Sequence, residues 1–444
     1  MTLPGPPAPA ATVTLSLADL HASLGDPVMA SMNMLSEIAE RHPDAISFAS
    51  GSPYEGYFDT ESLHRHLRTF CDHLAHDRGM DEAQVTRTLF QYGRTKGVIT
   101  DLLATYLARD ENIHVDPESL VVTVGCQEAI LLVLRALRRD ARDVVLTVSP
   151  SYVGLTGAAR LLDMTVVPVR EGPLGIDLDD LTEQLRRTRA DGLRPRALYL
   201  VPDFSNPSGR SLDMATRHRL LALAEEADIL LLEDNPYGLY TRAETRPPTL
   251  KALDTRRRVV YLGSLAKTGL PGARVGFAVA DQPVTGAGPG GLLADQLSTL
   301  KSMVTVNTSP LAQAVIGGKL LENDCRLSLA NRRETEIYRH HLDCLLNGLD
   351  KRWPAAVRAR LGIDWNVPGG GFFVVLTVPF RVDDELLARS ARRHGVLWMP
   401  MHHFYAGAGG HRQLRLSYSR ITPERIDEGL DRLKALVDEE CRAR

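Results

Sequence analysis

The chain has 444 residues, enough for two or three lobes around a large core. Its 52 Lys and Arg nearly balance its 55 Asp and Glu, and the net charge of −3 argues against a nucleic-acid-binding surface or recruitment to anionic lipid. The five cysteines are scattered without CxxC spacing, which favours free thiols in a cytoplasmic protein over a disulfide framework or a zinc site.

The N-terminal segment differs in composition from the rest of the chain. Residues Met1–Ala11 are rich in Pro and Ala and lack the basic and apolar parts of a signal peptide, so we expect a disordered lead-in. We assign residues 1–45 to this lead-in and an arm. The sequence has no run of about 18 apolar residues, so no segment is predicted to span a membrane.

Short apolar runs alternate with amphipathic helical stretches through the middle of the chain. Helices are predicted between several of these runs, for example over Gln127–Leu137 and Ala215–Ala227. The runs are rich in Val, Leu and Ile, which is typical of strands covered on both faces. The seven predicted strands are Leu120–Val124, Val144–Val148, Thr165–Val169, Ala197–Val201, Ile229–Glu233, Val259–Leu262 and Val275–Val279. We therefore predict a three-layer αβα domain with a mostly parallel seven-stranded sheet over residues 46–327.

The pattern changes near Ser328. A long helix is predicted over Arg332–Leu349, followed by short alternating strands that include Leu414–Ser419, and the chain finishes in a charged helix from Pro423 onward. We predict that residues 328–444 form a smaller α+β domain. The Gly-rich stretch Thr285–Gly291 is predicted to be a flexible surface loop.

The segment Gly263–Gly276 combines residue types that suit a phosphorylated aldehyde. Lys267 stands three residues after Ser264 and seven before Arg274, in a stretch broken by glycines and a proline. Such a stretch bends tightly and brings the three side chains toward one point. A hydroxyl and a guanidinium bind phosphate, and an amine attacks an aldehyde.

This segment resembles the cofactor-lysine segment of class I and II aminotransferases, which are fold-type-I enzymes that use pyridoxal 5′-phosphate (PLP). The likeness extends from about Ala45 to the C-terminus. It implies that Lys267 binds the cofactor covalently and acts as the general acid and base, with Ser264 and Arg274 at the phosphate.

Two further segments resemble the family in the same order along the chain. The segment 201–209 (VPDFSNPSG) places Asn206 where the family has an asparagine that contacts the cofactor's phenolic oxygen and lies beside the substrate. The segment 232–238 (LEDNPYG) places Asp234 at the pyridine nitrogen and Tyr237 near the phenolic oxygen. Without the resemblance, the first segment is simply a turn, and Asp234 is a cap for the next helix.

Residues after two other predicted strands match the family's cofactor contacts. Gly125, Cys126 and Gln127 resemble the turn whose N–H groups bind phosphate at a helix start. Cys126 replaces the usual small hydroxyl residue, which removes one expected side-chain bond to phosphate and leaves a thiol nucleophile as an alternative reading. Tyr152 matches the aromatic residue that stacks on the pyridine ring.

Three more matches concern the substrate and a second subunit. Tyr92 resembles the tyrosine that reaches the phosphate of the neighbouring subunit, which implies a homodimer. Arg415 resembles the arginine that binds the substrate α-carboxylate, a planar bidentate contact that lysine does not reproduce. Gly51 matches a glycine beside that carboxylate. The segment 307–310 (NTSP) matches the same subunit interface.

The segment 398–405 (WMPMHHFY) departs from the common Pro-Gly pattern and resembles the dihydroxyphenylglycine transaminase branch of specialised metabolism. We expect its bulky groups to face the substrate or the mouth of the cleft, with His402 or His403 bonding a ring hydroxyl. The aromatic residues Tyr54, Tyr57 and Phe58 support an aromatic or arylglycine-like substrate. Closure of the interface between the lobes is the alternative role for these side chains.

The predicted activity is transfer of an amino group between an α-amino acid and an α-oxoacid, with PLP and no metal. The same cofactor residues also suit oxidation, elimination or γ-replacement, so another PLP reaction is the alternative. A transcriptional regulator with an aminotransferase-like domain is disfavoured, because the residues before the matched region carry too little basic charge for a winged helix.

Overall fold

The computed structural model describes residues 13–26, 29, 37–38, 40–286 and 291–443. The predicted lead-in Met1–Ala11 and residues 287–290 of the predicted surface loop lie outside this part of the chain. Among the helices described, none combines the length and apolar character needed to cross a bilayer.

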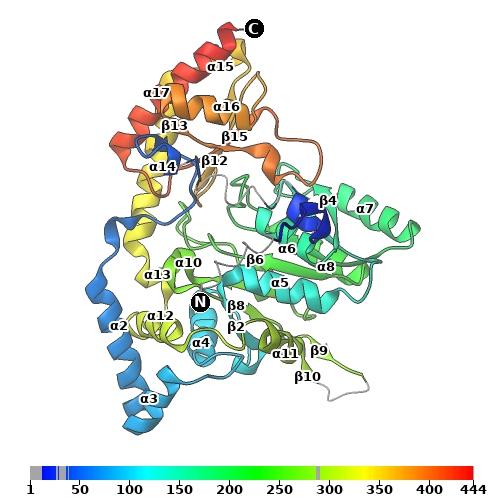
Figure 1. Ribbon diagram of the computed structural model, residues 1–444, viewed down its shortest axis with the longest axis vertical. Coiled ribbons are helices and arrows are strands. Elements are labelled where there is room, and N and C mark those ends of the chain that lie inside the picture. Colours follow the sequence, from blue (N-terminus) through cyan, green and yellow to red (C-terminus); the bar gives the residue numbers. More distant parts are fainter. Residues whose placement is uncertain (1–12, 27–28, 30–36, 39, 287–290, 444) are drawn as a thin grey trace, which may run out of the picture.

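A seven-stranded sheet forms the centre of the larger lobe (Figure 1). Its strand order is β2-β8-β7-β6-β5-β3-β4, and all neighbouring pairs are parallel except those made by β8. The strands are β2 (Leu120–Val124), β3 (Asp143–Ser149), β4 (Thr165–Arg170), β5 (Arg194–Leu200), β6 (Leu230–Asp234), β7 (Val259–Ser264) and β8 (Val275–Val279). The predicted αβα fold with a mostly parallel sheet is confirmed, with differences only at strand ends.

Helices cover both faces of this sheet, which explains why its strands are apolar throughout. One face packs on α5 (Gly125–Leu137), α6 (Val153–Leu161) and α11 (Leu293–Val304). The other face packs on α7 (Leu178–Ala190) and α8 (Met214–Glu226) at one end, and on α4 (Thr100–Asp110) and α12 (Pro310–Glu322) at the other. Successive residues such as Val145 and Leu146 point to opposite faces and enter different cores.

The smaller lobe holds an antiparallel sheet in the order β11-β12-β15-β14. Its strands are β11 (Asp364–Trp365), β12 (Phe373–Thr377), β14 (Met399–Pro400) and β15 (Gln413–Ser417). Helices α14 (Arg332–Arg352), α15 (Ala355–Leu361), α16 (Asp384–Arg389) and α17 (Pro423–Arg442) complete this lobe, above the larger one in Figure 1. The predicted helices from Arg332 and Pro423 are therefore found.

The first strand of the described chain belongs to the smaller lobe. Strand β1 (Ile46–Ser47) pairs with β13 (Val396–Leu397), and Phe48 lies fully buried in the same core as α14 and α17. The prediction placed residue 46 at the start of the larger domain. The pairing instead puts 46–49 with the C-terminal lobe, because strand partners distant in sequence leave no local pattern.

Two segments link the lobes. One runs from β1 through the short turn η3 (Glu55–Tyr57) to α2 (Thr60–Asp72), which packs against α12. The other runs through α13 (Leu327–Ala330) into α14. Strands β2, β3, β5, β6 and β7 are parallel, so their carboxyl ends share one edge of the large sheet, where ligands of open α/β sheets bind.

Candidate active site

A cavity of about 540 Å³ lies where the carboxyl edge of the large sheet meets the smaller lobe. Its walls include most of the residues singled out from the sequence: Gly51, Cys126, Gln127, Tyr152, Asn206, Asp234, Tyr237, Ser264, Lys267, Arg274 and Arg415. These residues come from seven segments that are separated along the chain. The fold therefore brings together side chains that were chosen separately by motif.

Lys267 lies in the one-turn helix α10 (Leu265–Thr268), which begins directly after β7. Ser264 caps this helix, and its hydroxyl accepts from the N–H of Ala266 at 3.4 Å. The Lys267 ammonium donates to the carbonyl of Gly51 at 2.8 Å. Burial, followed by the nearby guanidinium groups of Arg415 and Arg274, lowers the pKa of Lys267 to about 8. A neutral, nucleophilic amine is thus accessible near neutral pH.

Side chains from elsewhere in the fold hold the turn that carries Lys267. Tyr240 donates to the carbonyl of Lys267 at 2.5 Å. Lys319 and Asn331 both donate to the carbonyl of Thr268, at 3.0 and 2.8 Å. A four-residue helix leaves its last carbonyls without internal partners, and these donors satisfy them. These three residues belong to no local motif, so the sequence alone does not identify them.

Asp234 is the last residue of β6 and is almost fully buried. Its Oδ2 accepts from the hydroxyl of Tyr199 at 2.6 Å, and its Oδ1 lies 3.6 Å from the thiol sulfur of Cys126. Burial raises the pKa of Asp234 to about 6, while the hydrogen bonds from Tyr199 and Cys126 lower it. Tyr199 was missed from the sequence, although a tyrosine in an otherwise aliphatic buried strand is a usable signal.

The turn from β2 into α5 faces the guanidinium group of Arg274. A Cβ atom at Gly125, where φ is +71°, would lie 2.3 Å from Nη2 of Arg274, and one at Gly276 would lie 2.4 Å from the backbone nitrogen of Cys126. Both positions require glycine for this close approach. Within the described residues Arg274 has no carboxylate partner and bonds only the carbonyl of Pro271, at 3.3 Å. A cation facing a helix start suits a phosphate group.

Two side chains of this turn have hydrogen-bond partners other than Arg274. The thiol of Cys126 lies against Asp234, and burial, then the Asp234 charge, raises the pKa of that thiol well above its usual value. A protonated thiol is a poor nucleophile, which argues against the alternative reading of Cys126. The Gln127 amide donates to the carbonyl of Gly154 at 2.7 Å. The backbone N–H groups at the start of α5 are therefore left as the donors that this turn offers to a phosphate.

Arg415, on β15, is buried with 5% of its surface exposed. Its Nη1 donates to the side-chain oxygen of Asn206 at 2.6 Å, and its Nη2 donates to the carbonyl of Ala49 at 2.7 Å. The guanidinium lies 4.2 Å from the ring centre of Phe373 and 4.9 Å from that of Phe404. Burial lowers its pKa to about 10, and Nε has no partner among the described residues. A buried cation with neutral partners fits an incoming carboxylate.

Tyr152 and Tyr237 both line the cavity, and burial raises the pKa of both phenols. Both phenols are therefore neutral at ordinary pH. The ring of Tyr237 packs on Phe372 and Phe373, with ring centres 5.1 and 5.6 Å apart. Tyr237 and Asn206 share a hydrogen bond that lowers the Tyr237 pKa, which places two polar groups side by side at the cavity.

Tyr92 is not part of this cavity. It follows α3 (Glu82–Phe90) and is 84% exposed, so it does not reach the site of its own chain. Phe90, Met303 and Val306 are also exposed. This position is compatible with contact to another subunit, and the shared-site role of Tyr92 stays a prediction.

The expectation that His402 and His403 face the substrate is wrong. Nε2 of His403 lies 2.6 Å from the carboxylate of Asp384, and the His402 ring stacks on His411. An ionised carboxylate on α16 attracts both imidazoles, so the segment presents Met399 and Phe404 to the cavity instead.

The protein-family model described as aminotransferase class I and II matches residues 59–433. The chain belongs to this family. The (S)-3,5-dihydroxyphenylglycine transaminase of Amycolatopsis orientalis is 57% identical over 423 residues, covering 95% of this chain and 94% of that protein. The 2-aminoadipate transaminase of Thermus thermophilus is 32% identical and covers 88% of this chain and 90% of its own length.

Solved structures agree with this assignment. LysN, the α-aminoadipate aminotransferase of Thermus thermophilus in complex with N-(5′-phosphopyridoxyl)-L-leucine, superposes with a TM-score of 0.79 at 30% identity, covering 97% of this chain and all of that one. The kynurenine aminotransferase of Pyrococcus horikoshii gives a TM-score of 0.78 at 26% identity, covering 91% and 94%. The protein is a PLP-dependent transaminase of fold type I.

The residues present in the cavity fit PLP. Arg274 and the start of α5 offer a cation and N–H groups for phosphate, and Gly125 and Gly276 leave the room that a Cβ would fill. Asp234 offers a buried carboxylate for a protonated ring nitrogen, and Lys267 offers an amine for the aldehyde. Each of these groups lacks a charged partner of opposite sign among the described residues.

Proposed function

We propose that this transaminase moves an amino group between an aromatic or arylglycine-type α-amino acid and an α-oxoacid. The observation that carries the substrate class is the 57% identity, over nearly the whole chain, to a protein that acts on (S)-3,5-dihydroxyphenylglycine. The apolar and aromatic cavity walls from Tyr152, Phe373, Met399 and Phe404 support it. We infer a role in specialised metabolism, such as antibiotic biosynthesis.

In this proposal Arg415 binds the substrate carboxylate. Its guanidinium is fixed by Asn206 and Ala49 and lies between two aromatic rings, so little side-chain entropy is lost when a carboxylate binds. Gly51 and Asn206 border the same space. A substrate held there by its carboxylate places its α-carbon toward the Lys267 amine.

Lys267 and Asp234 carry the chemical step. When bound, PLP supplies an aldehyde that takes up the amino group and a ring that withdraws electrons from the α-carbon. The Lys267 amine would act as the general base for the α-proton and then as the general acid that returns it, which its pKa of about 8 permits near neutral pH. The ionised Asp234 carboxylate holds a proton on the ring nitrogen, and Tyr199 orients that carboxylate.

The phosphate site is assigned to Gly125, Cys126 and Gln127 through their N–H groups, to Ser264 and Arg274 through their side chains, and to Tyr92 of a second subunit. Tyr152 would pack against the cofactor ring, and Asn206 and Tyr237 would bind its phenolic oxygen. Exposed Phe90, Tyr92, Met303 and Val306 support a homodimer. Cys71, Cys126, Cys325 and Cys344 form no disulfide among the described residues, which favours a reducing compartment, the cytoplasm. We retain the division into larger and smaller domains near residue 328, with 46–49 assigned to the smaller one.

The test is a single-turnover screen of amino donors without any oxoacid. A transaminase converts its cofactor to pyridoxamine phosphate and stops after one equivalent of oxoacid per site. We expect hydroxylated arylglycines and aromatic amino acids to react fastest. Faster reaction of short aliphatic or basic donors would contradict the substrate class. Continued product formation without pyridoxamine phosphate would identify oxidation, elimination or γ-replacement instead.

A further inference from the structure

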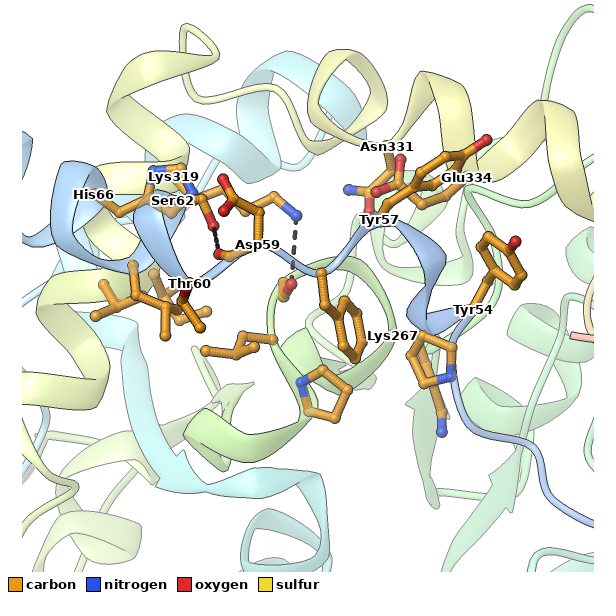
Figure 2. Close-up of a pocket in the computed structure, with 18 residues that line it drawn as sticks. Tyr54, Tyr57, Asp59, Thr60, Ser62, His66, Lys267, Lys319, Asn331 and Glu334 are labelled. Atoms are coloured by element: carbon orange, nitrogen blue, oxygen red, sulfur yellow. Dashed lines mark hydrogen bonds between the residues drawn. The ribbon is translucent and has the colours of Figure 1, made fainter. Parts of the chain in front are cut away.

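A second cavity lies behind the stem of Lys267, between the two segments that link the lobes (Figure 2). Its volume is about 290 Å³, enough for one aromatic ring with a short polar chain. The apolar part of its wall is formed by Tyr54, Tyr57, Phe58, Leu63, Leu270 and Ile316. The Lys267 amine is bonded to the carbonyl of Gly51, so the aliphatic stem is the part of Lys267 that borders this hinge cavity.

Two groups of opposite charge line the hinge cavity without pairing. The Lys319 ammonium on α12 donates to the carbonyls of Thr268 and Gly269, at 3.0 and 3.3 Å, which leaves its third hydrogen free. Glu334 on α14 has neither a hydrogen bond nor an ion pair within the part of the chain that is described. Burial lowers the pKa of Lys319, and the charge of Glu334 raises it. The two groups therefore interact electrostatically across the cavity.

This arrangement selects one kind of ligand. A simple anion satisfies Lys319 but meets Glu334 and the exposed Asp59, which also lines the cavity. A simple cation satisfies the carboxylates and leaves the ammonium of Lys319 without a counter-ion. An α-amino acid carries both charges on adjacent groups, and an aromatic side chain suits the rings of Tyr54, Tyr57 and Phe58.

We propose that the hinge cavity binds the zwitterion of an aromatic α-amino acid as a second, non-reacting molecule. Its carboxylate accepts from Lys319, its ammonium donates to Glu334, and its ring packs against the apolar wall. The bound molecule joins α12 of the larger lobe to α14 of the smaller one. It also contacts, through Lys319, the turn that carries Lys267, which makes this a site from which amino acid supply can act on the enzyme.

Binding to the active site has to be separated from binding to the hinge cavity. Reduction of the holoenzyme with borohydride makes the bond between Lys267 and the cofactor permanent, so no transamination occurs. L-phenylalanine is then titrated by calorimetry into the wild-type protein and into the variants Lys319→Gln, Glu334→Gln and Arg415→Met. Lys434→Gln, which removes an exposed lysine paired with Asp438 on α17, is the matched control. The probes 3-phenylpropanoate and 2-phenylethylamine each lack one of the two charges.

We expect one L-phenylalanine per chain in the wild type, Arg415→Met and Lys434→Gln proteins, and an affinity at least tenfold weaker in Lys319→Gln and Glu334→Gln. Both single-charge probes should also bind at least tenfold more weakly. Absence of binding, loss of binding in Arg415→Met, or an affinity in both hinge variants equal to that of the wild type would overturn the proposal. Lys319→Gln also removes support from the turn that carries Lys267. If the Lys319→Gln protein does not fold, the affinity of the Glu334→Gln protein alone tests the proposal. The outcome is independent of which donor the enzyme transaminates.

Discussion

Arg415, Lys267 and Asp234 share a feature at the residue scale: each is a buried or partly buried charged group whose hydrogen-bond partners are neutral. Arg415 bonds an amide and a carbonyl, Lys267 bonds a carbonyl, and Asp234 bonds a hydroxyl and a thiol. Burying a charge without a counter-ion costs free energy that a ligand of opposite charge recovers. The same burial shifts the pKa of each group in the direction that favours its neutral form, which makes the site sensitive to pH.

The Lys267 pKa of about 8 predicts how fast the apoenzyme captures PLP. Only the neutral amine attacks the aldehyde, so the rate should rise with pH and level off above about 8, well below the range of a free lysine. Trapping the adduct with borohydride at timed intervals measures this rate. Arg415→Met should move the midpoint upward, because a neighbouring positive charge is lost. A wild-type midpoint near that of exposed lysine would contradict the assignment.

Tyr199→Phe tests the support of Asp234. Removing the hydroxyl deletes a hydrogen bond that favours the carboxylate, so the Asp234 pKa should rise above about 6. A protonated Asp234 no longer holds the proton on the ring nitrogen, and the acid limb of kcat should therefore shift to higher pH by about one unit, or about 1.4 kcal/mol. Tyr261→Phe, a buried tyrosine on β7 outside this cavity, is the control. Coincident pH profiles for Tyr199→Phe and the wild type would exclude this role.

At the scale of elements, the site depends on strands of the smaller lobe meeting the N-terminal segment. Phe373 on β12 and Arg415 on β15 lie on neighbouring antiparallel strands, and the Phe373 ring touches both the guanidinium and Gly51. A Cβ at Gly51 would lie 2.7 Å from the tip of this ring. The segment after β1 therefore fixes the ring that covers Arg415.

Gly51→Ala should displace the Phe373 ring and weaken carboxylate binding, while the phosphate contacts are unaffected. We expect KM for the amino donor to rise about tenfold, and stability to fall by about 1–3 kcal/mol from overpacking. Steady-state kinetics and thermal unfolding measure the two effects, and PLP affinity should not change. Gly25→Ala, where a Cβ would meet nothing within 4 Å, is the matched control. An unchanged KM would show that the ring adjusts without cost.

Elements with a local signal were predictable from the sequence, and those that depend on distant partners were not. The seven strands of the large sheet carry continuous apolar runs because helices cover both faces, and the runs identified each strand. The two residues of β1 carry no such pattern, and their pairing with β13 was not foreseen.

Among the site residues, Lys267, Asp234 and Arg415 lie in recognisable motifs. Tyr199, Tyr240, Lys319 and Asn331 act only through contacts made after folding. His402 and His403 are oriented toward Asp384, which lies on α16. Because α16 is outside the segment 398–405, this orientation could not be predicted from the segment alone.

At the scale of the whole molecule, Tyr92 predicts that active sites are shared between two subunits. Mixing a Tyr92→Phe chain with a Lys267→Ala chain should produce hybrid dimers with one doubly altered site and one unaltered site. Activity should then exceed the average of the two parent homodimers. Subunit exchange is verified with a mass tag on one chain. Activity equal to that average, despite proven exchange, would exclude a shared site.

The bond between Arg415 and the carbonyl of Ala49 joins residues 366 positions apart. The residues of one chain that are proposed to contact the cofactor, from Gly125 to Arg274, are translated well before Arg415 leaves the ribosome. During synthesis, residues 46–49 are therefore not yet paired with the C-terminal lobe when the large sheet assembles. Contacts of such long sequence separation form late and slowly. A nascent or C-terminally truncated chain is thus expected to bind PLP before it is able to bind an amino acid, so substrate recognition is the last property that the folding chain acquires.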